Sequence, residues 1–233
     1  RICLVGSEMC IRDRYGIHAS AVRGLLIEEV TVQQTDHGGL IVDDGSEDVH
    51  ISRALVRWTN QRSLVATHEA ISLSDVHDFV LEDSCVLDVG EEGIDVKDGS
   101  TDGVVRYNKV RGAAAVGMYL NLTEGIEVHH NTVIRSGTAG MLLATGDHAT
   151  GEATTANVLH HNVFAYNEQN GIELWRGPGS GEQTLTDNVF THNSVYGNGH
   201  CGIRAQDGAD NLFADTLLPV SYTHLTLPTK CWV

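Results

Sequence analysis

Apolar and polar residues alternate along most of this chain in short segments that begin with glycine. The segments GIDVK, GMYLN, GMLLA and GIELW start at Gly93, Gly117, Gly140 and Gly171. Such alternation predicts β-strands with one buried face, because successive side chains of a strand point to opposite sides. No stretch sustains apolar residues at the i, i+3, i+4 spacing of a helix, so the pattern predicts an all-β chain.

The glycine-led segments recur at intervals of 23, 24 or 31 residues. A fixed period of this length is typical of stacked repeats. A unit of this size has room for three short strands and three turns, which make one coil of a parallel β-helix. The sequence therefore predicts a solenoid of about eight coils. Its opening residues are Gly16, Gly39, Ala70, Gly93, Gly117, Gly140, Gly171 and Gly202.

A second phrase, seen in VRYNKV, VHHNTV, LHHNVF and LTDNVF, follows the glycine-led strands. Asn tolerates the left-handed backbone that a sharp bend needs, and stacked amides can bond to one another. We expect one column at this bend, formed by Asn108, Asn131, Asn162 and Asn188 and held in earlier coils by Ser84, Ala54 and Val30.

Strand alternation also separates an inner side from an outer face. The residues expected in the core are Ile94, Val96, Met118, Leu120, Met141, Leu143, Ile172 and Leu174, with Val110, Val133, Phe164 and Phe190 on another inner wall. The outer face reads, in coil order, His18, Ile41, Asp43, Ser72, Ser74, Asp95, Lys97, Tyr119, Asn121, Leu142, Ala144, Glu173, Trp175, Arg204 and Gln206. Loops rich in Gly, Thr and Ser, residues 145–156 and 176–183, are expected beside this face.

The repeat resembles the right-handed parallel β-helix repeat family of the pectate-lyase-like superfamily over roughly residues 16–213. EEGIDVKDGS at residues 91–100, followed by VRYNKV, is especially similar to secreted bacterial members. The resemblance implies a right-handed single-stranded parallel β-helix, a secreted or cell-surface location, and a substrate groove along a strand face. It leaves the reaction open, because the superfamily includes lyases, hydrolases, epimerases, adhesins and non-catalytic repeats.

The repeat stops at both ends of the chain. LVGSEMCIRDR and VSYTHLTLPT resemble translations of the transposase adapters used in preparing sequencing libraries. We therefore expect residues 1–14 and 220–233 to be non-native segments around a β-helix fragment at 15–219, read from a metagenomic source. Genuine capping segments of the solenoid are the alternative.

The net charge of −16 narrows the choice of partner. Such an acidic chain will not bind nucleic acid or an anionic membrane by bulk attraction. No apolar run is long enough to span a membrane. Polysaccharide is the partner that the outer face favours, and the sequence leaves the oligomeric state open.

Two outer-face residues suit the chemistry of a polysaccharide lyase. Such an enzyme needs a base for the proton α to a uronate carboxylate, a cation for the developing enolate and a proton donor for the leaving oxygen. Lys97 is a candidate base and Tyr119, on the next coil, a candidate donor. A solvated Lys97 paired with Asp95 is the structural alternative, and this carboxylate would raise the pKa of the lysine.

Further along the same face, aromatic and polar side chains suit a sugar chain. A ring such as Trp175 can cover the apolar side of a pyranose while polar groups fix its hydroxyls. We expect substrate contacts from Asn121, Glu173, Trp175 and Arg204. A solvated sheet face is the alternative.

Carboxylates crowd the turn before the strand that holds Lys97. Glu91, Glu92 and Asp95 are similar to the groupings that hold Ca²⁺ in some pectate lyases, so the resemblance implies a possible calcium site; a solvated acidic turn is the alternative. A hydrolase ranks lower, because Asp95 and Glu173 stand three coils apart, too far for a catalytic pair.

Two His-His doublets, at residues 129–130 and 160–161, stack on neighbouring coils. We expect a surface ladder and no metal site, on the reasoning that consecutive residues cannot place both imidazoles on one face. We expect one column to continue as Arg106 and Thr186, and the other as Tyr107 and Asp187.

The sequence thus predicts a secreted β-helix protein that acts on or binds polysaccharide, with a calcium-assisted lyase of acidic glycans as the favoured enzyme. Whether it is an enzyme stays open. The alternative is a non-catalytic carbohydrate-binding, adhesive or structural cell-surface repeat.

Overall fold

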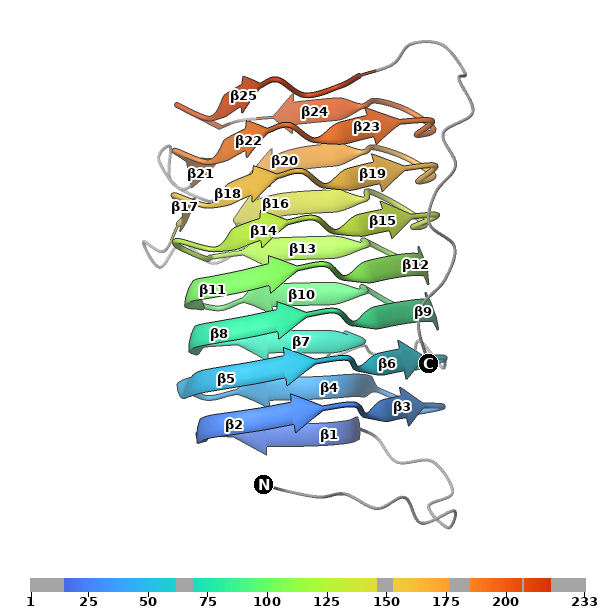
Figure 1. Ribbon diagram of the computed structural model, residues 1–233. Coiled ribbons are helices and arrows are strands. Elements are labelled where there is room, and N and C mark those ends of the chain that lie inside the picture. The colour runs from blue at the N-terminus through green and yellow to red at the C-terminus, as the bar shows by residue number, and fades with distance from the viewer. Residues whose placement is uncertain (1–14, 62–68, 146–152, 177–184, 207, 219–233) are drawn as a thin grey trace.

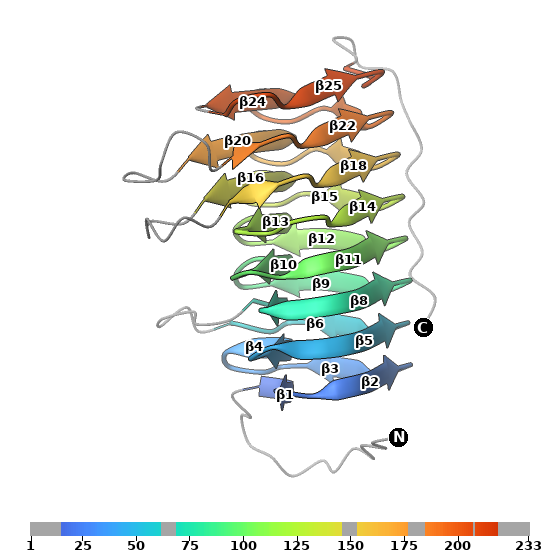
Figure 2. The same ribbon diagram turned by 90° about the vertical axis from the view of Figure 1, so that its left-hand side faces the viewer.

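The computed structural model describes residues 15–61, 69–145, 153–176, 185–206 and 208–218. These residues form a right-handed parallel β-helix, in which successive coils supply the strands of three long parallel sheets (Figure 1). The side view shows the coils stacked in chain order along one axis (Figure 2). The predicted fold class is confirmed. The predicted non-native segments lie outside the described residues, as do the middles of both predicted loops.

The three sheets are named here in the order in which the chain enters them. The first sheet contains β1 (Tyr15–Ser20), β4 (Gly38–Asp43), β7 (Ile71–Ser74), β10 (Ile94–Lys97), β13 (Met118–Asn121), β16 (Met141–Thr145), β20 (Ile172–Arg176) and β24 (Ile203–Gln206). The second sheet contains β2 (Arg23–Glu28), β5 (Ser46–Ser52), β8 (Val76–Glu82), β11 (Thr101–Arg106), β14 (Glu127–His129), β18 (Val158–His160), β22 (Val189–Thr191) and β25 (Leu212–Ala214).

The third sheet has seven strands in the described chain. It contains β3 (Thr31–Gln33), β6 (Leu55–Arg57), β9 (Cys85–Val89), β12 (Lys109–Ala113), β15 (Thr132–Ile134), β19 (Val163–Ala165) and β23 (Ser194–Tyr196). A short pair, β17 (Thr154–Thr155) and β21 (Leu185–Thr186), lies at the side of the stack. Among the described residues we find no helix with the length and apolar character of a membrane span.

The glycine column precedes the strands of the first sheet because the coils approach one another closely there. A Cβ added to Gly93 would lie 2.5 Å from the carbonyl oxygen of Gly117 and 2.6 Å from Cγ1 of Val110. Both distances are shorter than side chains tolerate, so only glycine fits without a shift of the backbone. The glycine recurs every 23 to 31 residues because nearly every coil needs a residue without a side chain where it contacts the next coil.

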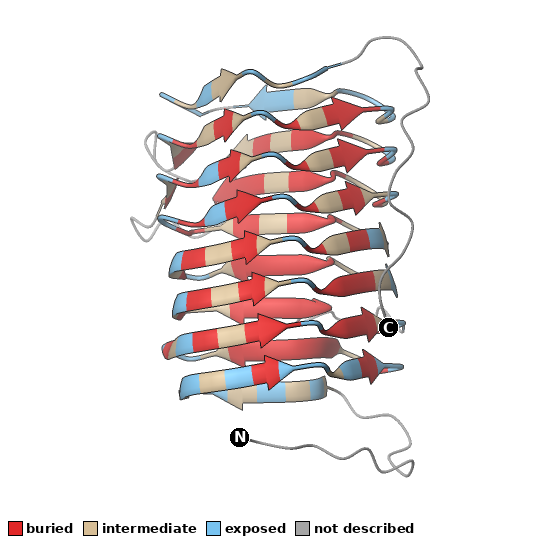
Figure 3. Ribbon diagram, viewed as in Figure 1, coloured by how far each residue is buried: buried red, intermediate tan, exposed pale blue. Residues whose placement is uncertain are grey.

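The core is a column of aliphatic and aromatic side chains enclosed by the three sheets, and burial decreases in the terminal coils (Figure 3). All twelve residues expected in the core are buried. Phe190, however, lies on β22 of the second sheet, paired with Leu159, and not on the wall that holds Phe164. Val195 takes the position after Phe164 in the third sheet. That part of the predicted register is wrong.

The same shift affects the Asn column. Nδ2 of Asn131 donates to Oδ1 of Asn162 at 3.0 Å, and Nδ2 of Asn162 donates to Oδ1 of Asn193 at 3.0 Å. Asn188 instead bonds to Asn157 and Asn211 in a second, parallel column. The expected column thus continues through Asn193, 31 residues after Asn162, which is the spacing of the glycine column in the same coils.

Candidate functional site

The outer face of the first sheet aligns the predicted site residues in two rows. Strand register places Asp95, Tyr119, Leu142, Glu173 and Arg204 side by side in one row. The second row, two residues further along each strand, contains Lys97, Asn121, Ala144, Trp175 and Gln206. The predicted outer face is therefore assembled as expected. Asp95 and Glu173 are three coils apart, as the sequence indicated.

A buried ionic cluster stands at one end of these rows. Nζ of Lys97 donates to Oε1 of Glu69 at 2.8 Å and to Oδ2 of Asp95 at 3.0 Å. The Lys97 side chain is 16% exposed and that of Asp95 only 2%. The solvated pair that stood as the structural alternative is therefore a largely buried one, and only a small part of its surface is open to a ligand.

Sequence reasoning missed Glu69. It directly precedes Ala70, as Glu92 directly precedes Gly93, so the two glutamates occupy the same position in neighbouring coils. The backbone confirms this, because the N–H of Ala70 donates to the carbonyl of Glu92 at 3.1 Å. The aligned period contains this signal, because a glutamate precedes the opening residue in both coils.

Burial and crowding shift the pKa values of this cluster. Burial, followed by the charge of Glu69, raises the pKa of Asp95 well above its usual value despite the opposing ammonium. Burial also raises the pKa of Glu92. For Lys97, burial alone would lower the pKa, but the charges and hydrogen bonds of Asp95 and Glu69 outweigh it and raise the pKa. Lys97 is thus held as an ammonium, and protons are retained on the carboxyl groups more readily than in water.

Tyr119 lies beside Asp95 on the adjacent strand. Burial, followed by the charges of Asp95 and Glu92, raises the pKa of this phenol. Tyr119 is therefore a protonated O–H group, which can donate a hydrogen bond and gives up its proton only to a strongly basic oxygen.

Several polar atoms around the cluster are buried without a hydrogen-bond partner in the described chain. They are Oδ1 of Asp95, Oε2 of Glu69, Oγ of Ser72 and Oδ1 of Asn121. Because buried polar groups are nearly always satisfied, such a concentration is typical of a place that receives water or a ligand. Asn121 lies directly beside Lys97 in the register, so this predicted substrate residue belongs to the cluster.

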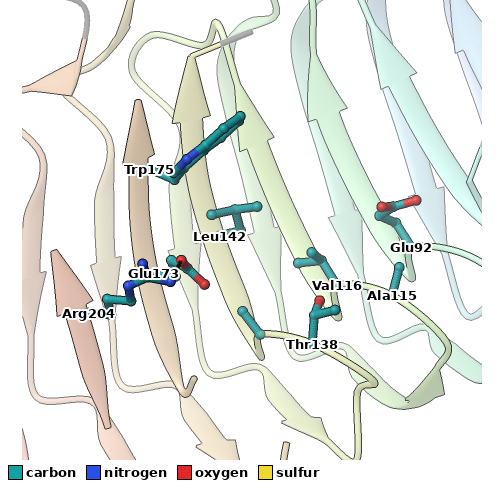
Figure 4. A pocket seen from close by; sticks show the side chains of 9 residues that line it. Glu92, Ala115, Val116, Thr138, Leu142, Glu173, Trp175 and Arg204 are labelled. Atoms are coloured by element: carbon teal, nitrogen blue, oxygen red, sulfur yellow. Dashed lines mark hydrogen bonds and ion pairs between the residues drawn. The ribbon is translucent and has the colours of Figure 1, made fainter. Parts of the chain in front are cut away.

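A groove of about 350 Å³ adjoins the cluster on the same face (Figure 4). Trp175, Leu142 and Glu173 line one part, and Glu92 stands at the far end. Oε1 of Glu173 accepts a hydrogen bond of 2.9 Å from Arg204, so this carboxylate is already neutralised. The volume falls in the range of ordinary ligand pockets. The structure thus brings the predicted residues Glu173, Trp175 and Arg204 together.

The three carboxylates predicted to hold calcium do not form a ligand set. Asp95 is engaged by Lys97, whereas Glu92 faces the groove. Within the described ranges, no group of three or more His, Cys, Asp or Glu side chains is arranged to hold a metal ion. The residues present therefore do not fit a calcium site with its six to eight oxygen ligands.

Sequence and structure comparisons identify relatives of this chain. Residues 3–200 match the family model described as periplasmic copper-binding protein (NosD). Among curated proteins, none matches the chain.

Two solved structures share the fold. The periplasmic alginate epimerase AlgG is 14% identical with a TM-score of 0.75, and the match covers 88% of this chain and 48% of that one. The A-module of the mannuronan C-5 epimerase AlgE6 from Azotobacter vinelandii is 15% identical with a TM-score of 0.71, covering 88% of this chain and 52% of that one. This chain spans about half the length of each, and at such identity the likeness shows the fold.

Proposed function

The chain belongs to the family of periplasmic copper-binding proteins called NosD, and from this membership and the geometry of the first sheet we propose a protein that works outside the cytoplasm on a polysaccharide. The main observation in favour of a polysaccharide substrate is the position of Glu92. This residue lines the groove that contains Trp175, and its charge also acts on the Asp95–Lys97 cluster. This position of Glu92 supports the proposal that the groove and the ionic cluster act on the same ligand.

The groove has the composition that sugars need. Trp175 and Leu142 offer an apolar surface to the face of a pyranose, while Glu92, Glu173 and Arg204 offer hydrogen bonds to hydroxyl groups. A sugar chain lying along the groove would run from Trp175 to Glu92 (Figure 4). Two proteins of the same fold are named as epimerases of alginate and mannuronan, which agrees with a polysaccharide on this face.

As the reaction we propose β-elimination on an acidic glycan. Glu92 accepts the proton α to the uronate carboxylate, since its raised pKa makes it a stronger base than an ordinary glutamate. The C–H electron pair forms the new C=C bond and the glycosidic C–O bond breaks. Tyr119 donates its proton to the leaving oxygen, and the Lys97 ammonium stabilises the enolate charge. Lys97 thus serves as the cation, because a protonated lysine cannot be the base.

The net charge of the ionic cluster affects how strongly an acidic substrate is repelled. The ammonium of Lys97 contacts the carboxyl groups of Glu69 and Asp95, and it also interacts electrostatically with Glu92. A proton retained on Asp95 removes one negative charge, so the carboxylate of a uronate meets less repulsion. No step is routed through calcium, because the predicted ligands do not converge.

A non-catalytic carbohydrate-binding repeat is the second candidate. It is favoured by the pairing of Lys97 with two carboxylates, an arrangement that can also serve to lock neighbouring coils together. In that case the groove binds a glycan and the cluster is structural.

The test is incubation of the purified protein with uronate polymers and, in parallel, neutral polysaccharides. Elimination creates unsaturated ends that absorb in the ultraviolet, and affinity electrophoresis measures retention. We expect unsaturated ends from a uronate polymer and their loss in Tyr119→Phe, which keeps the ring and removes the hydroxyl. Retention without products supports the binding repeat, and neither retention nor products contradicts both proposals.

A further inference from the structure

A histidine ladder runs along the second sheet, where the chain bends toward the third. We use this name for His129, His130, His160, His161 and His192. The rings of His129 and His160 stack with centroids 5.0 Å apart and an interplanar angle of 2°. His130, His161 and His192 form a second stack, with separations of 5.1 and 5.0 Å. The expected continuation through Thr186 and Asp187 is wrong, because Thr191 and His192 occupy those positions.

Within each doublet the two imidazoles face one another. Nδ1 of His129 lies 2.8 Å from Nδ1 of His130, and the His160–His161 pair has the same separation. The backbone makes this possible, because His130 and His161 have φ angles of 57° and 55°. A left-handed residue turns its side chain back toward its predecessor. The sequence argument that a doublet cannot share one face holds for an extended strand and is wrong at this bend.

The opposed nitrogens of each pair are nearly collinear with the ring centres. Each nitrogen lies about 1.2 Å from the centre of its ring by ordinary imidazole geometry, so a separation of 2.8 Å in a straight line places the centroids about 5.1 Å apart. The measured centroid distances are 5.1 Å in both pairs. One nitrogen must therefore carry the shared proton, and the other must present its lone pair along the same line.

For the second pair, the neighbouring carboxylate identifies the lone pair. Nε2 of His160 lies 2.8 Å from Oε1 of Glu127, which can only accept, so Nε2 carries the ring proton. The neutral ring then has a bare Nδ1 directed at His161. A carboxylate that holds the far nitrogen of an imidazole is the usual support of a metal-binding histidine.

We propose that each histidine pair binds one monovalent copper ion, Cu(I), between its two Nδ1 atoms, in place of the shared proton. Collinear donors suit a d¹⁰ monovalent ion, which accepts two ligands in a line, whereas Zn²⁺ requires four. With metal–nitrogen bonds of about 2 Å, the nitrogens must separate by about 1 Å, a movement open to the exposed rings of His130 and His161. The donating ring moves its proton from Nδ1 to Nε2, so no proton is released and no electron is transferred.

This site is separate from the groove, since it lies on another sheet, and it does not depend on the proposed action on polysaccharide. The family description names copper without placing it. Each histidine pair of this chain supplies two facing nitrogens for one ion. The arrangement occurs on two neighbouring coils.

The test is competition for Cu(I) between the purified chain and a chromogenic chelator under anaerobic conditions, with Ag(I) as a redox-inert probe. We expect His130→Asn and His161→Asn each to lower the copper retained by one equivalent, and the double variant by two. Asn tolerates the left-handed backbone, so the bend is preserved. Every variant carries the same cysteines as the parent, so the difference reports the ladder alone.

The matched control is His50→Asn. His50 lies on the same sheet and pairs with Glu82 at 2.9 Å, but it has no adjacent histidine. Its variant should retain as much copper as the parent. A double variant that retains as much Cu(I) as the parent overturns the proposal, as does a ladder that takes Zn²⁺ and not Ag(I). Circular dichroism of each variant shows whether a loss reflects unfolding.

Discussion

The ammonium of Lys97 donates a hydrogen bond of 2.8 Å to Oε1 of Glu69, a residue 28 positions earlier in the chain. The two side chains belong to neighbouring coils and meet on the outer face of the first sheet. Lys97 also contacts Asp95 at 3.0 Å, so one cation serves two carboxylates. This relationship decides the protonation state of the lysine and thereby its chemical role.

Replacing the cation should weaken the fold. We expect Lys97→Met to lower the free energy of unfolding by about 3 kcal/mol, because loss of one partner leaves buried carboxylates uncompensated. Urea denaturation at neutral pH measures this. The control is Arg23→Met, whose ion pair with Glu47 is exposed and should cost less than about 1 kcal/mol. Equal losses from the two variants would mean that the cluster is not a buried pair in solution.

The raised pKa of Asp95 predicts a pH dependence of stability. A carboxyl whose folded pKa lies above its unfolded value of about 3.9 stabilises the native state when protonated. That contribution is complete below about pH 4 and is lost as pH rises through the folded pKa. Relative to Asp95→Asn, which does not titrate, the parent should therefore lose stability from about pH 4 upward. Urea denaturation of both proteins across this range provides the measurement.

Glu82 provides a control of opposite sign. Burial would raise its pKa, but hydrogen bonds from Arg106 and His50 outweigh this and lower it. Its contribution is present above the unfolded pKa of about 4.3 and is lost as pH falls through the folded value. Relative to Glu82→Gln, the parent should lose stability toward acid pH. The prediction for Asp95 fails if both comparisons slope in the same direction.

The Asn column should be most sensitive in its interior. Asn162 bonds to Asn131, Asn193 and the carbonyl of Val128, all buried. We expect Asn162→Ala to cost about 3 kcal/mol of unfolding free energy, because it leaves several buried groups unsatisfied. Asn198→Ala, at the partly exposed end of a similar column, should cost about 1 kcal/mol, since water can replace the lost bonds. Thermal and urea unfolding compare the two, and an equal cost contradicts the buried-ladder account.

Trp175 should contribute to glycan binding without supporting the fold. We expect Trp175→Ala to weaken retention of the bound polysaccharide about tenfold, which corresponds to about 1.4 kcal/mol, with an unchanged melting temperature. Affinity electrophoresis measures the first quantity and calorimetry the second. Trp58→Ala is the matched control, because Trp58 is 40% exposed and lies outside the groove residues. Equal weakening by both substitutions would place the sugar elsewhere.

Calcium provides a direct check on the predicted cation site. Lys97 engages one oxygen of Asp95, and within the described residues the three predicted carboxylates do not gather into a group that could hold a metal ion. We expect calcium to leave the melting temperature unchanged and a chelator to leave glycan retention unchanged. A rise in melting temperature with calcium that disappears in Glu91→Gln would restore the site predicted from the sequence.

Most of the fold was predictable because stacking imposes local rules on every coil. Gly93 is glycine because the next coil passes within contact distance, and the same constraint keeps glycine at seven of the eight opening positions, with the small residue Ala70 at the other. The predicted register was wrong in the coil that contains two similar Asn segments. Asn188 and Asn193 both fit the bend, and only the 31-residue spacing shared with the glycine column separates them.

The candidate site was only partly predictable. Strand alternation correctly aligned Lys97 with Asn121 and Asp95 with Tyr119. It did not include Glu69, which lies just before its strand, outside the alternating segment. It also could not show that the left-handed bends at His130 and His161 bring each doublet together, because alternation describes extended backbone.

By itself, the sequence determined the solenoid, its coil length and the direction of most side chains, because these follow from period-two strands and glycine sterics repeated in every coil. The tertiary structure decided which charged side chains contact one another and how far each is exposed to solvent. Asp95 is a carboxylate on an outward position, yet stacking against Glu69, Lys97 and Tyr119 buries it and raises its pKa. Desolvation depends on neighbours from other coils, and no local pattern in the chain encodes it.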